Sequence, residues 1–146
     1  MIYDKTLEFC EKKSVGAAIT SDVLDLKQEH PNTGSCTPPF YLVLFPLAVS
    51  GTSETDAITF TLEDSADNST FSALLSVTAL ANSMKHAVSI PMPVVHRRYL
   101  RLKTAIKGTP TGTLTAILNN HIEILQTKPV EGWDIIRAGD DPVTTA

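Results

Sequence analysis

The residues that most often perform catalysis or bind metals are few and scattered in this sequence. The four histidines, His30, His86, His96 and His121, are far apart, and each is better explained as a solvated or singly hydrogen-bonded side chain than as a ligand. The sequence contains no GxSxG, HExxH, Walker or GxGxxG signature. We therefore expect no enzymatic activity, no catalytic residues and no cofactor.

The acidic stretch EDSADNS, residues 63–69, is the one place where carboxylates gather. Carboxylate oxygens could bind calcium, but the stretch lacks the alternating acids, the glycine and the distant glutamate of an EF-hand loop. Asp and Asn side chains also accept hydrogen bonds from nearby backbone N–H groups in tight turns. Because strand-like segments flank the stretch, we interpret it as a hairpin turn and predict no metal site.

The two cysteines, Cys10 and Cys36, belong to no CxxC motif and have no histidine near them in the sequence. Neither a zinc site nor a thioredoxin-like site is indicated. The opening residues MIYDKTLEFCEKK are charged from the fourth residue and lack the apolar region of a secretory signal. We expect synthesis in the cytoplasm and two reduced thiols without a disulfide.

The stretch HRRYLRLKTAI, residues 96–106, combines basic residues with an apolar rhythm. On a strand it would direct Leu100, Leu102 and Ile106 to one face and Tyr99, Arg101 and Lys103 to the other. The chain has 12 Lys and Arg against 16 Asp and Glu, a net charge of −4, which argues against nucleic-acid binding. Two interpretations remain: a solvated sheet face, or a surface that contacts a protein of opposite charge.

The segments that would position these side chains are mostly strands. Helical patterns are short and confined to LEFCEKK (7–13) and ALANSMKH (79–86), which could form a turn or two. Seven or eight strand-like segments separated by turn residues predict an all-β antiparallel β-sandwich, either immunoglobulin-like or a jelly roll. The clearest segments are residues 21–26, 40–49, 57–65, 70–79, 87–92, 96–106 and 113–125.

Alternation within these segments predicts the core and one irregular point. Pro46 interrupts the apolar run FYLVLFPLAV, so we expect a bulge or a sheet edge there. That run is too short to span a bilayer, and we predict no membrane partner. The predicted core residues are Phe60, Leu62, Leu100, Leu102, Leu114 and Leu118.

The chain of 146 residues fits one sandwich domain, residues 1–125, which includes an N-terminal arm. Residues 126–146 are rich in Pro and Gly and lack periodicity, so we expect an extended C-terminal arm. Large side chains outside periodic segments have little local core to enter, and we expect them to bury against a partner. These residues are Tyr3, Trp133, Ile135 and Ile136.

The order of segments also resembles a known family. IYDKTLEF, PFYLVLFPLAV, ITFTLEDSADNSTFSALLS and IPMPVVHRRYLRLKTAIKGTPTGTLTAIL together resemble the capsid cement, or decoration, proteins of tailed bacteriophages, of the kind found in a short-tailed Bordetella phage. The resemblance covers residues 1–122 and rests chiefly on "RRYLRLK" following "IP" and on the hairpin "TLEDSADNSTF".

This resemblance implies a jelly roll that assembles as a homo-oligomer, a dimer or trimer, on the outer surface of the virion. There it would bridge subunits of the phage major capsid protein and stabilise the shell, after synthesis in the bacterial host cytoplasm. It implies no catalytic residues. We predict a partner interface formed by Arg97, Arg101, Lys103, Tyr3, Trp133, Ile135 and Ile136.

Two other functions remain open from the sequence. One is a carbohydrate-binding jelly-roll module, which would need exposed aromatic rings, and the chain has few aromatic residues, 6%. The other is a different head or tail component of the virion.

Overall fold

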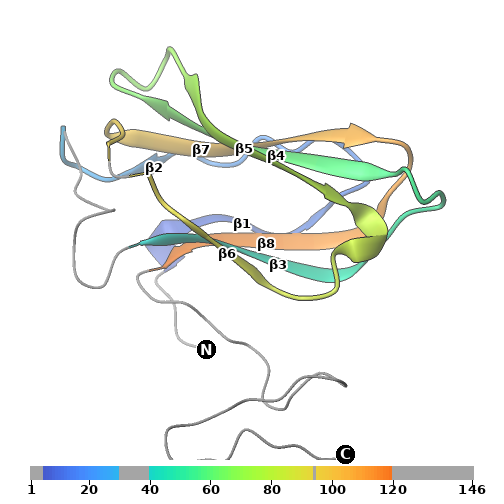
Figure 1. The fold of residues 1–146 in the computed structure, drawn as a ribbon. Coiled ribbons are helices and arrows are strands. Elements are labelled where there is room, and N and C mark those ends of the chain that lie inside the picture. Colours follow the sequence, from blue (N-terminus) through green and yellow to red (C-terminus); the bar gives the residue numbers. More distant parts are fainter. Residues whose placement is uncertain (1–4, 30–39, 94, 120–146) are drawn as a thin grey trace, which may run out of the picture.

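Two antiparallel sheets face each other in the computed structural model, which describes residues 5–29, 40–93 and 95–119 (Figure 1). The described residues contain eight strands and two single-turn 3-10 helices, and no α-helix. In chain order they are η1 (Lys5–Leu7), β1 (Glu8–Ser14), β2 (Leu24–Asp25), β3 (Tyr41–Ser50), β4 (Ala57–Ser65), β5 (Ser72–Leu80), η2 (Ala81–Ser83), β6 (Val88–Pro91), β7 (Tyr99–Lys107) and β8 (Thr111–Asn119).

The strand order is β1-β8-β3-β6 in one sheet and β2-β7-β4-β5 in the other. Only β4 and β5 are consecutive strands within one sheet, and every other connection crosses between the sheets. In Figure 1 the chain therefore passes repeatedly from the upper layer to the lower one. The predicted all-β sandwich is confirmed at this level.

The space between the sheets holds the core, and all six predicted core residues lie there. Their exposed fractions are 1% or less, because side chains point alternately to the two faces of a strand and these six point inward from β4, β7 and β8. They are Phe60, Leu62, Leu100, Leu102, Leu114 and Leu118.

The N-terminal helical expectation is wrong. LEFCEKK forms most of β1, which pairs with β8 and buries Phe9 and Cys10. Two register irregularities interrupt this pairing, and Lys12 has a left-handed φ of 47°, so the alternation that marks a strand is lost. In the second segment, ALANSMKH, a single turn is confirmed at Ala81–Ser83.

Pro46 lies where β3 becomes a sheet edge. The sequence predicted either a bulge or an edge at this residue, and the edge is confirmed. β6 pairs with β3 only as far as Leu44, whereas β8 continues past Pro46. The bulge comes two residues later, at Ala48, where φ is 53°. Gly112 lies opposite this bulge with φ 109°, and a Cβ there would approach the Ala48 carbonyl oxygen to 2.6 Å.

The described helices include none that is long and apolar enough to cross a membrane. The predicted C-terminal arm, residues 126–146, lies outside the described residues, so the division of the chain at residue 125 stays a prediction.

Candidate interaction surfaces

Arg101 is held in place by its neighbours on the outer face of the β2-β7-β4-β5 sheet. Antiparallel pairing of β4 with β7 sets it opposite Glu63, and its Nε donates to Glu63 Oε2 at 2.6 Å. Its guanidinium also stacks on the Phe71 ring, 3.9 Å from the ring centroid. The side chain is 26% exposed, so this cation is already engaged within the chain.

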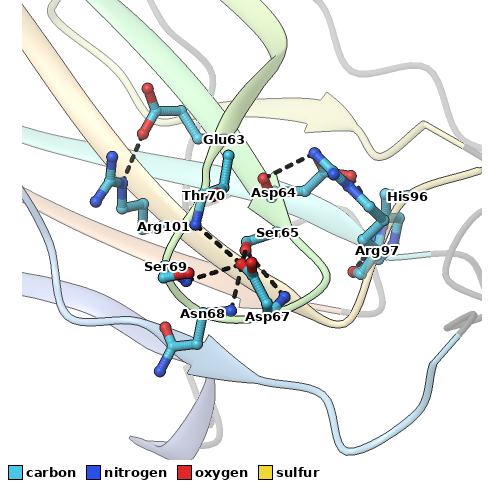
Figure 2. Close-up of polar contacts among 10 residues, drawn as sticks. All are labelled: Glu63, Asp64, Ser65, Asp67, Asn68, Ser69, Thr70, His96, Arg97 and Arg101. Carbon is cyan, nitrogen blue, oxygen red and sulfur yellow. Dashed lines mark hydrogen bonds and ion pairs between the residues drawn. The ribbon is translucent and has the colours of Figure 1, made fainter.

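Arg97 and Arg98 are also paired with carboxylates of the same chain. Arg97 Nη2 donates to Asp64 Oδ1 at 2.7 Å, and the Arg97 backbone N–H donates to Asp64 Oδ2 at 2.9 Å (Figure 2). Burial alone would raise the pKa of Asp64, but the contacts with Arg97 outweigh burial and lower it. Arg98 donates two hydrogen bonds to the Asp25 carboxylate, of 2.6 and 2.8 Å, and they lower the pKa of Asp25 to about 2.

The predicted hairpin turn is confirmed between β4 and β5, and Asp67 organises it. Its Oδ1 accepts hydrogen bonds from the backbone N–H groups of Ser69 and Thr70, both at 2.9 Å, and from the Ser65 hydroxyl at 2.8 Å (Figure 2). These donors lower the pKa of Asp67 well below its usual range. Asn68 takes the left-handed conformation, φ 61°, which Asn tolerates better than most residues. These hydrogen bonds hold the β4–β5 turn in one conformation.

The rest of this outer face is polar. The hydroxyls of Thr59 and Thr78 are 2.9 Å apart, and those of Thr61 and Ser76 are 3.3 Å apart, linking β4 to β5. Lys103 lies opposite Thr61 on β7, and no residue in the described ranges forms an ion pair or hydrogen bond with its side chain. Lys103 is therefore the cation of the predicted interface that is available to a partner.

The outer face of the other sheet, β1-β8-β3-β6, has an apolar row along β3, which is flanked by Thr113 and Thr115 of β8 and by Ser89 of β6. On β3 the residues of odd number up to Leu47 point away from the core, since Leu42 and Leu44 point into it. Leu47 is 61% exposed, and Val43 is fully buried beside its cross-strand neighbour Ile117 on β8. We call this the apolar face; its residues are Tyr41, Val43, Phe45, Leu47 and Ile117.

The first residue of β1 and the last residue of β8 lie beside this apolar face. Glu8, the first residue of β1, pairs with Ile117, and Asn119, the last residue of β8, pairs with Tyr41. The described chain therefore enters β1 and leaves β8 at one corner of the same sheet. The predicted interface residues Tyr3, Trp133, Ile135 and Ile136 themselves lie outside the described residues.

The predicted interface is thus only partly brought together. Arg97, Arg101 and Lys103 belong to the β2-β7-β4-β5 sheet or its flank, and two of the three already bind carboxylates. The carboxylate partners were missed because they lie more than thirty residues away in sequence. The apolar face had a signal: FYLVLFPLAV is apolar at both parities, and an antiparallel strand with one solvated face would alternate.

The remaining chemical candidates are dispersed. Cys10 is buried, burial raises the pKa of its thiol, and its Sγ is 3.8 Å from the Leu114 carbonyl oxygen. Cys36 lies outside the described residues, so the predicted absence of a disulfide stays a prediction. His96 is buried with Nδ1 2.9 Å from the Arg97 carbonyl oxygen, and His86 is exposed. Within the described ranges no three His, Cys, Asp or Glu side chains group as metal ligands.

Fold and surfaces together define an all-β sandwich protein with one polar outer face and, on the other sheet, an outer face that carries an apolar row along β3. The chain belongs to the Bbp16 family, whose model matches residues 9–120. This match spans every strand, apart from the first residue of β1. No curated protein sequence matches the chain.

Proposed function

We propose that this protein is a capsid cement protein of a tailed bacteriophage, which binds the outside of the shell and bridges neighbouring subunits of the major capsid protein. The Bbp16 family name fits the resemblance to Bordetella phage proteins. The protein would act by binding alone, without catalysis or a cofactor. Its place would be the virion surface, after synthesis in the bacterial host cytoplasm.

The observation that carries the proposal is the apolar face. Exposed apolar side chains that lie together on the outside of a domain often mark contact with another macromolecule. Val43 and Ile117 are fully buried, so the accessible part of this face is Leu47 with the partly buried Tyr41 and Phe45. Leu47 is 61% exposed, and the half-buried Phe45 precedes it by two residues on the same face of β3. Hydrophobic contact with the shell through these side chains would exclude water and supply most of the binding free energy.

The arms extend this contact. Because Glu8 and Asn119 lie at one corner of the sheet, arms attached there start beside the apolar face. We propose that Tyr3, Trp133, Ile135 and Ile136 bury against adjacent capsid or cement subunits, with Trp133 as the main anchor. A homo-oligomer, a dimer or trimer, bound at several points on a repeating lattice would multiply a modest affinity per site.

The fold we infer is a jelly roll. The strand orders β1-β8-β3-β6 and β2-β7-β4-β5 support it, because they are those of eight antiparallel strands arranged as two Greek keys in a double sheet. An immunoglobulin-like sandwich would place its first two strands in one sheet, whereas β1 and β2 lie in opposite sheets. A rigid sandwich of this kind suits a protein that must resist pressure from inside the shell.

Co-sedimentation tests the proposal. Purified protein should pellet with empty capsids of its phage and should be a stoichiometric component of purified virions. Deleting residues 127–146 should weaken attachment while the far-ultraviolet circular dichroism of the sandwich is retained. Failure of the full chain both to bind empty shells and to occur in virions would overturn the cement role.

Two controls distinguish the other functions. Retention on polysaccharide resins without capsid binding would indicate a carbohydrate-binding module. Presence in virions at a few copies, with no binding to empty shells, would indicate another head or tail component.

A further inference from the structure

The apolar face changes in exposure along β3. Near the corner where the chain enters β1 and leaves β8, Val43 and Ile117 are fully buried. Toward the other end of β3, Phe45 is half-buried and Leu47 is 61% exposed. We call Phe45 and Leu47 the open end of the apolar face. A segment that covers the open end must supply apolar surface, because these two side chains have no hydrogen-bonding group.

Two lysines border the open end, one on each side of β3. Phe45 pairs with Thr115 on β8, and the Thr115 hydroxyl oxygen accepts a hydrogen bond of 3.0 Å from the Lys12 backbone N–H. Lys85 lies between η2 and β6, on the other side of β3, and its Nζ is 3.4 Å from the Val49 carbonyl oxygen. Within the described ranges, neither ammonium group forms an ion pair with a carboxylate. The open end is therefore an apolar surface with unpaired positive charge beside it.

The last part of the sequence has the matching composition. Residues 131–141, EGWDIIRAGDD, lie outside the described ranges. They contain Trp133, Ile135 and Ile136 among four acidic residues and one basic residue. A segment that combines large apolar side chains with negative charge complements an apolar surface that lysines border.

The chain that precedes this segment is long enough to bring it to the open end. Asn119, the last residue of β8, pairs with Tyr41, and Leu47 is six residues farther along β3, about 20 Å away. The 13 residues 120–132 precede Trp133 and could span about 43 Å if fully extended, which leaves enough chain to turn back over the sheet. A short tether of this kind gives an effective concentration in the millimolar range. The chain's own segment therefore has an advantage over the same segment of another molecule.

We propose that residues 131–137 of this chain cover the open end of its own apolar face in the free protein. The Trp133 ring would pack on Phe45 and Leu47, and the acidic side chains beside it would approach the two bordering lysines. This cover would keep apolar surface from water before the protein meets a shell. The inference rests on the proposed function for one step only: on the shell, the segment would leave its own face and bind a neighbouring subunit.

Fluorescence of the full chain tests this cover, because Trp133 is the single tryptophan. A ring that packs with one of its two faces on the sheet loses about half of its collisions with a quencher such as acrylamide. Acrylamide should therefore quench the Leu47→Asp variant about twofold more strongly than the wild type. Leu80→Asp, a matched change at an exposed leucine of the other sheet, should be quenched as the wild type is. Far-ultraviolet circular dichroism verifies that both variants remain folded.

A mixing experiment distinguishes the chain's own face from the face of a second copy. Trp133→Ala is a full chain without tryptophan, and its open end has lost the main covering side chain. Leu47→Asp, refolded together with an excess of Trp133→Ala, should keep its strong quenching, because its Trp133 has lost the face on its own chain.

Two results would overturn the proposal. One is equal quenching of the wild type and Leu47→Asp. The other is protection of Trp133 in the mixture, which would mean that a second copy supplies the face. Neither measurement uses capsids, so a failure of this cover and a failure of the cement role are distinguishable.

Discussion

The two outer faces of the sandwich differ in chemistry. On the β2-β7-β4-β5 sheet, the charged side chains of Glu63 and Arg101 neutralise each other, and threonine hydroxyls link the strands. On the β1-β8-β3-β6 sheet, the outward positions of β3 hold aliphatic and aromatic side chains beside Thr113 and Thr115 of β8, and Leu47 is 61% exposed. The first face pairs Arg101 and its threonine hydroxyls internally and leaves Lys103 without a partner among the described residues, whereas the second buries Val43 and Ile117 and leaves Leu47 exposed.

The two faces would therefore have different roles: the polar face makes the sheet rigid, and the apolar face offers surface for binding. Ion pairs at the surface contribute little net stability, but several of them together with a fixed turn hold the polar sheet in one shape. Burial of apolar surface is the larger source of affinity in most interfaces. Under the proposed function, shell attachment would therefore rest mainly on the apolar face and the predicted arms.

The core supports both faces, so a cavity in it should produce the largest effect. Leu102 is fully buried on β7, and Leu102→Ala should lower the free energy of unfolding by about 2–5 kcal/mol. Urea denaturation followed by circular dichroism measures this loss. Leu47→Ala, at an exposed site on the opposite sheet, should change stability by less than about 1 kcal/mol.

Acid should destabilise the β2-β7-β4-β5 sheet before the β1-β8-β3-β6 sheet. An unfolded aspartate titrates near pH 3.9, whereas in the folded chain the pKa of Asp25 is about 2 and those of Asp64 and Asp67 are also lowered. These groups contribute stability above about pH 4, and the contribution is lost as pH falls toward about 2. Their contacts lie around β2, β4 and β7.

Hydrogen exchange at several pH values measures this contrast. After correction for the intrinsic pH dependence of exchange, amides of Ser69 and Thr70 should lose protection in acid before those in the centres of β3 and β8. Simultaneous loss across both sheets would contradict a separate acid response of the polar face.

Removal of the Arg101 cation should give the smallest effect. Arg101→Met keeps an apolar stem over Phe71 but loses the bond to Glu63 and the cation–π contact, at a cost of about 0.5–1.5 kcal/mol. Lys103→Met, which breaks no contact in the described structure, should be close to neutral. Thermal unfolding of the pair measures the difference. Equal losses would mean that the Arg101 contacts contribute nothing.

Sequence reasoning succeeded where structure is local and periodic. Alternation identified the inward residues Phe60 and Leu102, and turn chemistry identified the hairpin at Asp67. Sequence reasoning failed at β1, whose residues do not alternate between polar and apolar. They form an edge strand because they pair irregularly with β8, which lies about one hundred residues away in the sequence.

The same limit applies to the candidate interface. That Arg101 faces outward follows from parity, but its pairing with Glu63 depends on the register between β4 and β7, which no local pattern specifies. The apolar run of β3 was recognised as a strand, yet its outward half could be assigned to a surface only once the two sheets were in place.

Quantitative binding to empty capsids by two opposed variants tests most directly whether the apolar face attaches the protein to the shell. Leu47→Lys places a charge on the apolar face, and Lys103→Glu reverses the available cation on the polar face. We predict that Leu47→Lys weakens capsid binding at least about tenfold, while Lys103→Glu changes chiefly the association rate and its salt dependence. Wild-type affinity for Leu47→Lys together with a large loss for Lys103→Glu would contradict this assignment and place the interface on the polar face.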